Sequence, residues 1–152
     1  MLSLHMDPPE PSGAVAHHAL VAELSDAAID ALLAVAGPEA QSLVMSVELR
    51  HLGGALAAPQ GGATSRLDAA YLLFALAMAP TPEFVAAGTE ATRAVVAALA
   101  PWASRQHFLN FADHTIDVET AFDAESWERL VRVRESVDPD RVWVAAHPVG
   151  AA

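Results

Sequence analysis

The stretch from Leu43 to His51, LVMSVELRH, constrains the fold more than any other part of the sequence. Apolar positions alternate here with polar ones: Leu43, Met45, Val47 and Leu49 against Ser46, Glu48 and Arg50. Successive side chains of a strand point to opposite faces of the sheet. An antiparallel sheet commonly buries one face and leaves the other to water or to a cavity. We therefore predict that Ser46, Glu48 and Arg50 share an open face, which either is solvated or lines a cavity.

The remaining elements complete this layer. Further strands are predicted at residues 17–23, 71–78 and 107–111, and helices at residues 26–36, 82–100 and 124–138. Ser25, Thr81 and Asp123 supply the helix caps. The order predicts an α+β fold of two layers, an antiparallel β-sheet with helices packed on one face. Residues 1–16 are expected to form an irregular lead-in, and residues 17–152 a single domain.

Two helices carry predicted buried positions. In the first, Ile29, Leu32 and Leu33 are expected to face inward. In the last, one stripe is formed by Trp127, Leu130, Val131 and Val137. Pro139 disfavours a helical Asp138, so the helix is expected to end there and 142–144 to leave as an extended segment.

Composition excludes several classes of function. The formal net charge of -11 over 152 residues argues against nucleic acid and anionic membrane surfaces as partners. Because the chain has no cysteine, thiolate chemistry is excluded and a reducing compartment is favoured. The apolar run from Ala69 to Ala79 is shorter than the roughly 20 residues of a membrane-spanning helix. The N-terminus lacks the features of a secretory signal, so we expect a cytoplasmic protein.

The sequence offers no motif that by itself assigns a reaction. His17 and His18 are adjacent in a predicted strand and would point to opposite faces, so no metal site is predicted. The glycine pairs at 53–54 and 61–62 lack the spacing of a phosphate-binding loop. Catalytic residues therefore remain unassigned at this level.

Four segments of the sequence, taken together in their order along the chain, resemble a known family, although each of them alone is a weak match. The segment FDAESWERLVRVRESVDPDRVWVAAHPV, within residues 105–149, is similar to the C-terminal berberine-bridge-like segment of FAD-linked oxidases. HFLNF resembles the Tyr-x-Asn-[Tyr/Phe] motif of that family, with Phe108 in the tyrosine position and Asn110 retained. SVELRHLGGAL and LHMDPPEP resemble segments of the substrate-binding domain of the same family.

The resemblance implies a set of site residues. Phe108, Asn110 and His147 would lie at the cofactor, and Ser46, Glu48 and Arg50 would face the substrate. The base that some members carry after their Gly-Gly falls near Ala58, so that group is not retained. Members of the family are about three times as long and hold their flavin in an N-terminal domain, which has no counterpart here.

The resemblance leads to one functional hypothesis and leaves a second open. The chain would be the substrate-domain portion of an FAD-dependent oxidoreductase, binding FAD only with a complementary flavin-binding domain and inactive alone. The alternative is a free-standing, non-catalytic domain that binds a small ligand or itself. Half a sheet leaves an edge strand and an uncovered surface. Expected partners are thus a second copy, as a homodimer, or a separate flavin-binding domain.

Overall fold

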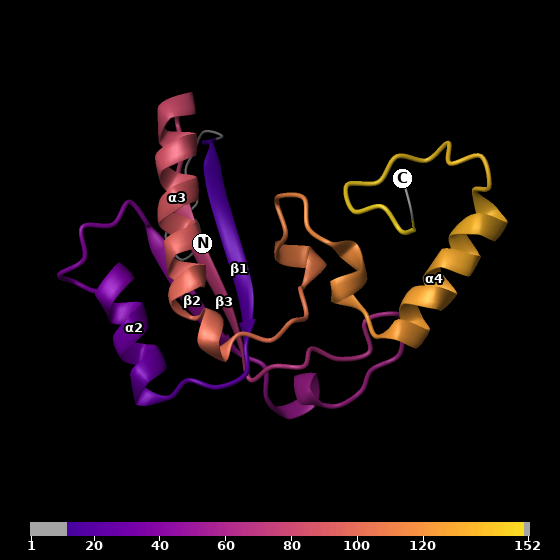
Figure 1. The fold of residues 1–152 in the computed structure, drawn as a ribbon, viewed down its shortest axis with the longest axis horizontal. Helices are drawn as coiled ribbons and strands as arrows, with labels where there is room; N and C mark the ends of the chain where they lie inside the picture. The colour runs from indigo at the N-terminus through magenta and orange to yellow at the C-terminus, as the bar shows by residue number, and fades with distance from the viewer. Residues whose placement is uncertain (1–11, 151–152) are drawn as a thin grey trace, which may run out of the picture.

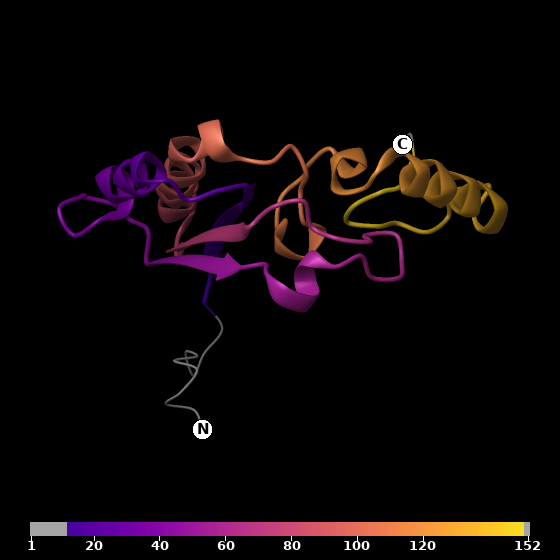
Figure 2. The same cartoon turned by 90° about the horizontal axis from the view of Figure 1, so that it is seen from below.

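A computed structural model describes residues 12–150 and contains one antiparallel sheet in the strand order β1-β3-β2. The strands are β1 (Ala14–Val21), β2 (Ser46–His51) and β3 (Tyr71–Met78). Figures 1 and 2 show helices on one side of this sheet, which confirms the predicted α+β class. Strand β3 has the predicted bounds, whereas β1 begins within the expected lead-in. The LHMDPPEP segment and the rest of 1–11 lie outside the described residues.

The strand register divides the side chains between two faces. Val21 is paired with Tyr71, and His17 with Ala75. Leu73, Ala75 and Val21 are fully buried and form a core with Val95 and Leu99 of the helical layer. Residues one position away point to the other face, where Leu20, Leu52 and Leu72 form a smaller cluster. The sheet is therefore apolar on both faces.

Helix α2 (Asp26–Ala36) begins at Ser25, whose hydroxyl accepts a hydrogen bond from the backbone N–H of Ala28. Ala28 is fully buried, and Leu32 packs against the same core. The prediction that Ile29 and Leu33 face inward is wrong, because these side chains are 42% and 52% exposed. The core takes the narrower stripe through Ala28 and Leu32, so α2 presents apolar side chains to its surroundings.

Helix α3 (Pro82–Ala98) packs across β1 and β3, and α2 packs beside it. A Cβ atom at Gly88 would lie 2.9 Å from Val15 Cγ2 and 3.1 Å from Ala77 Cβ. Glycine therefore permits the close approach of α3 to the sheet. Thr92 and Val95, both fully buried, continue this contact.

The predicted strand at 107–111 is not formed. The outer edge of β1 is already paired: Ala22 donates to the carbonyl of Trp102, and Ser104 donates to that of Leu20. The carboxylate of Asp113 accepts the N–H of Ala16 farther along the same edge. Residues Leu109–Phe111 instead form a 3₁₀ turn, η3, whose apolar side chains pack on the sheet.

Helix α4 (Ala124–Val137) stands at the far end of the molecule from the sheet (Figure 1). The carboxylate of Asp123 caps it by accepting the N–H of Ser126. No described α4 residue is buried, so the predicted buried stripe is wrong, and Val137 is 70% exposed. The predicted exit strand at 142–144 is also not formed, and Trp143 is 76% exposed. Trp127, Leu130 and Val131 are half-buried, and the ring of Trp127 stacks on that of Phe122 with 6.0 Å between their centroids.

The segment after α4 is fixed at its start. Asp138 is only 6% exposed, and its carboxylate is 3.0 Å from Nη2 of Arg134. The same carboxylate accepts the N–H of Val142.

Among the described residues, no helix is both long and apolar enough to cross a membrane.

Candidate functional site

The three polar residues of β2 lie on the face of the sheet opposite the helices. Ser46, Glu48 and Arg50 are paired with Leu76, Phe74 and Leu72 of β3. Their neighbour Val47 packs into the helix-side core, so the alternate residues point away from it. The side chains of Glu48 and Arg50 are 43% and 50% exposed. The predicted open face therefore carries the predicted residues, and their role is a separate question.

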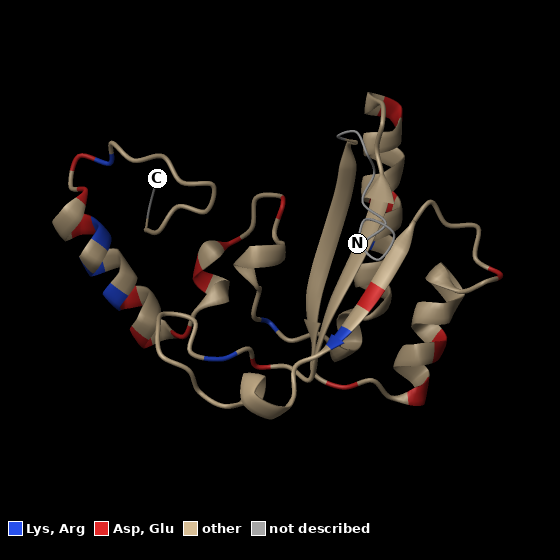
Figure 3. Ribbon diagram, turned by 180° about the vertical axis from the view of Figure 1, so that it is seen from behind, with Lys and Arg blue, Asp and Glu red and all other residues tan. Residues whose placement is uncertain are grey.

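Glu48 and Arg50 form one charged unit. Both Nε and Nη2 of Arg50 donate to Oε2 of Glu48, at 2.9 and 2.6 Å. The guanidinium carbon lies 4.9 Å from the ring centroid of Phe111, which is cation–π geometry. An exposed ion pair contributes little to stability. Here the two hydrogen bonds and the ring fix the direction of Arg50, and Figure 3 shows the acidic and the basic position of β2 close together along the strand ribbon.

Three phenylalanines continue this surface. The ring centroid of Phe111 is 5.3 Å from that of Phe74, edge to face, and 5.6 Å from that of Phe108. Phe108 and Phe111 pack against the buried cluster of Leu20, Leu52 and Leu72. We call Glu48, Arg50, Phe74, Phe108 and Phe111 the aromatic surface. It offers flat apolar rings beside one neutralised charge pair.

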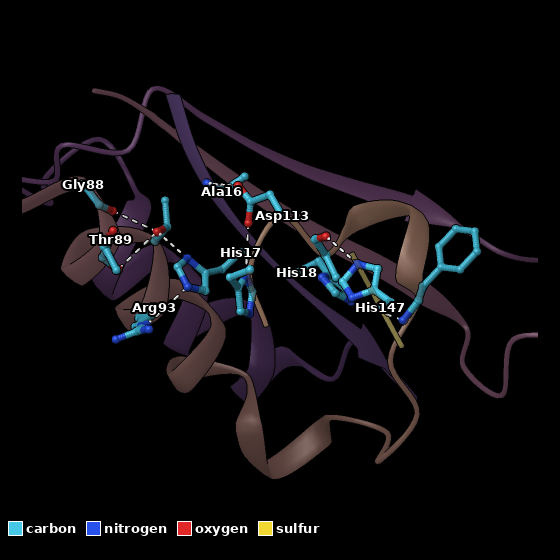
Figure 4. Close-up of polar contacts among 12 residues, drawn as sticks. Ala16, His17, His18, Gly88, Thr89, Arg93, Asp113 and His147 are labelled. Carbon is cyan, nitrogen blue, oxygen red and sulfur yellow. Dashed lines mark hydrogen bonds and ion pairs between the residues drawn. The ribbon is translucent and has the colours of Figure 1, made fainter. Parts of the chain in front are cut away.

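The residues predicted at the cofactor gather around η3. The N–H of Phe108 donates to Nε2 of His18 at 3.2 Å, which holds the start of the turn against β1. Asn110 is exposed. His147 returns from the C-terminal segment, and its Nε2 donates to the carbonyl of Ala112 at 3.1 Å (Figure 4). Phe111 thus lies between the two predicted groups, because it follows Asn110 in η3 and contacts Arg50.

His18 is a buried, neutral base under this turn. Since Nε2 accepts a hydrogen bond, its single proton is on Nδ1, which is buried without a hydrogen-bond partner. Burial first, and then the nearby His107, lower the pKa of His18 from 6.5 to about 4. His18 therefore accepts the Phe108 N–H throughout the neutral range.

His17 points to the helical layer and His18 to the other face, and the sequence predicts that these neighbours in a strand point to opposite faces. The hydroxyl of Thr92 donates to the carbonyl of Gly88, so it accepts from Nδ1 of His17 at 2.8 Å. Nε2 of His17 in turn accepts from Nε of Arg93 at 3.2 Å (Figure 4). Burial first, and then His114, lower the pKa of His17. Within residues 12–150, no group of three or more potential ligands is arranged to hold a metal ion.

An open cavity of about 870 Å³ lies elsewhere, between the sheet end of the molecule and the start of α4. Arg66, Arg105 and Gln106 line it together with acidic residues such as Asp117 and Glu119. None of the six predicted site residues lines this cavity. The aromatic surface is thus an open face of the sheet and is separate from the cavity.

Two residues of the aromatic surface were not singled out by sequence reasoning. Phe111 ends both a predicted strand and the HFLNF motif but is given no role in the sequence analysis, and Phe74 is only part of a predicted buried strand. The register places Phe74 directly opposite Glu48. The signal was therefore present in the sequence, but it depends on knowing which strands pair.

Among known proteins, the C-terminal part of the chain matches one family model. A family model described as berberine and berberine like matches residues 107–150. The chain resembles the C-terminal part of the berberine-bridge-like FAD oxidases. The matched residues contain η3, α4 and His147, so the berberine-bridge-like segment supplies one half of the aromatic surface. No curated protein sequence matches the chain.

Solved structures extend the likeness over nearly the whole chain. A variant of BBE-like 1 from the moss Physcomitrella patens superposes with a TM-score of 0.77 at 18% identity, covering 99% of this chain and 34% of the moss protein. The grass pollen allergen Phl p 4 gives 0.70 at 13% identity, covering 91% and 32%. Aclacinomycin oxidoreductase gives 0.64 at 19% identity, with the same coverage. The chain therefore shares their fold and spans about a third of their length.

Proposed function

We propose that this chain is the substrate-domain portion of an FAD-dependent oxidoreductase, and that its aromatic surface covers a flavin held by a separate flavin-binding domain. The observation that carries this proposal is that two separate parts of the chain meet at Phe111. One side of the surface comes from β2, and the other comes from the berberine-bridge-like segment. Two structural neighbours, a pollen allergen with glucose dehydrogenase activity and aclacinomycin oxidoreductase, support the reaction class.

The residues of the surface fit one part of FAD and not the other. Phe74 and Phe111 offer apolar ring area against which a planar ring system can pack. The exposed amide of Asn110 can both donate to and accept from the polar edge of such a ring. The glycine pairs within the described residues do not open a long helix after a strand, so no phosphate cradle is present there. We therefore assign contact with the isoalloxazine ring to this chain and the phosphates to the flavin-binding domain.

When bound, FAD supplies the acceptor for a hydride taken from a substrate C–H bond. The chain itself orients the substrate and excludes water. Arg50, held by Glu48 and Phe111, can direct a polar substituent of the substrate, while Phe74 keeps the adjoining area dry. Phe108 has no hydroxyl, so no proton is held at that position. His147 acts through Ala112 to position η3.

A fluorescence titration tests this proposal. We expect the purified chain alone to show no saturable FAD binding at micromolar concentrations, because it lacks groups for the phosphates. Adding the chain to the isolated, FAD-loaded flavin domain of a berberine-bridge-like protein should change the flavin emission saturably. Phe111→Ala should abolish that change, and Phe84→Ala, on the helical side, should leave it intact. Saturable binding of FAD by the chain alone would contradict the assignment. So would a change in flavin emission that is the same for the Phe111→Ala variant as for the original chain.

A further inference from the structure

The outer edge of β2 is open along its length. Within residues 12–150, no strand or loop pairs with it, whereas the outer edge of β1 is occupied by residues 102–104 and Asp113. Leu52 donates toward β3, to the carbonyl of Ala70. Alternate residues of an antiparallel strand hydrogen-bond to the same side. The outward N–H and C=O groups of β2 therefore belong to Val47, Leu49 and His51.

Apolar side chains accompany this edge. Leu49 is 39% exposed, and Met45 and Leu43, which lead into the strand, are 59% and 52% exposed. Helix α2 lies on the side of α3 away from β1 (Figures 1 and 2), and its Ile29 and Leu33 are also exposed. An open edge with exposed apolar neighbours is a template for pairing with another strand. It lacks the lysine and proline residues that commonly block such edges.

The charges of β2 favour a second copy of this chain as the strand that pairs with the open edge, and they favour one register for that pairing. A two-fold axis through Leu49 pairs that residue with its own copy and sets Glu48 opposite the partner's Arg50, twice by symmetry. An axis one residue earlier sets two glutamates opposite each other, and an axis one residue later sets two arginines opposite each other. Only the axis at Leu49 joins opposite charges. It also places them at the non-hydrogen-bonded pairs, where facing side chains are closest.

We propose that a second copy of this chain pairs antiparallel along β2 about a two-fold axis at Leu49, forming one continuous sheet from both copies. Such an interface is isologous, and every contact occurs twice. Glu48 and Arg50, which bond to each other within one chain, have a second partner of opposite charge across the axis. The helices of both copies lie on the same side of the joined sheet. The phenylalanines of both aromatic surfaces lie on the other side of the joined sheet, next to the Glu48–Arg50 contacts of the interface.

Charge exchange tests this interface in the full 152-residue chain. Sedimentation velocity from about 1 to about 100 µM should show a concentration-dependent dimer. Glu48→Arg or Arg50→Glu alone puts like charges opposite each other at two symmetric contacts, and each should raise the dimer dissociation constant at least about tenfold. An equimolar mixture of the two variants restores opposite charges across the axis. That mixture should dimerise with an affinity near that of the original chain.

Leu49→Pro supplies an independent variant. The N–H lost at this position points to the open edge and not to β3, so the sheet within one chain keeps its hydrogen bonds. We expect a folded monomer, with circular dichroism as the check on folding. A wild-type chain that stays monomeric over the whole range would overturn the proposal. A dimer whose dissociation constant is unchanged by both charge reversals would also overturn it. So would single variants whose equimolar mixture does not dimerise, which includes the case in which another polypeptide pairs with β2. None of these results depends on flavin, so they are distinct from the titration above.

Discussion

Acid should loosen the η3 turn through His18. In the folded chain Nε2 of His18 accepts the Phe108 N–H and Nδ1 has no partner, so protonation destroys one hydrogen bond and buries a charge. The pKa is about 4 when folded, against 6.5 for the free side chain. A lowered pKa means that the unfolded chain binds the proton more tightly. Stability is thus complete above about pH 6.5 and is lost as the pH falls towards 4.

The folded and unfolded pKa values of His18 set how much free energy of unfolding is lost in acid. Linkage gives at most about 2 kcal/mol lost between roughly pH 7 and pH 5 from this single group. The pKa of about 4 already includes the opposing effects of a backbone hydrogen bond with Phe111 and of the Asp113 carboxylate, so only hydration of the protonated ring would reduce the loss below this maximum. We therefore expect a loss of about 1 to 2 kcal/mol. His17, whose pKa is also lowered, adds a loss of the same sign.

Urea unfolding at several pH values measures this loss. His18→Gln keeps an acceptor for the Phe108 N–H without titrating, so its stability should fall less than that of the wild type over the same interval. The difference should be about 1 to 2 kcal/mol. His51→Gln, at an exposed position of β2, serves as the control and should follow the wild type. Equal losses in the wild type and in His18→Gln would refute the role given to His18.

Two further predictions concern the helical layer. Gly88→Val should lower the melting temperature markedly, because its Cβ would lie 2.9 Å from Val15 Cγ2 and would force α3 off the sheet, whereas Gly61→Val, with open space around it, should change it little. A melting temperature unchanged by Gly88→Val would contradict the close packing. Thr92→Val should cost about 1 to 3 kcal/mol of unfolding free energy in urea, because it leaves Nδ1 of His17 buried without an acceptor. Thr115→Val, at an exposed position, is its control, and equal costs for the two variants would speak against the buried hydrogen bond.

Local signals predicted the elements that satisfy their own hydrogen bonds or pair with near neighbours. Ser25, Thr81 and Asp123 precede the three helices as predicted, and the YLLFALAM run gave the bounds of β3. The predicted hydroxyl cap at Thr81 is wrong, because its hydroxyl donates to the carboxylate of Glu83 and makes no capping hydrogen bond. The alternation around Glu48 gave the correct face of the sheet, because side-chain direction in a strand depends only on position.

The errors arose where a distant residue decided the structure. Residues 107–111 look like a strand, but 102–104 and the Asp113 carboxylate already occupy the edge they would need. The apolar stripe of α4 is correctly spaced, yet full burial needs more packing surface than Phe122 and its neighbours give, so Trp127, Leu130 and Val131 stay half-buried and Val137 exposed. The meeting of Phe111 with Arg50 likewise requires the register of β2 and the fold of η3 together. No local pattern encodes such a contact.

Hydroxyl-radical footprinting tests the central claim most directly. The chain is oxidised alone and in the presence of a FAD-loaded flavin domain, and modification is read at individual aromatic side chains. The account predicts that Phe74 and Phe111 are protected in the mixture, while Phe84 on α3, which is 46% exposed, is modified equally in both samples. Unchanged modification of Phe74 and Phe111, or protection of Phe84 in their place, would contradict the claim that the aromatic surface covers the flavin.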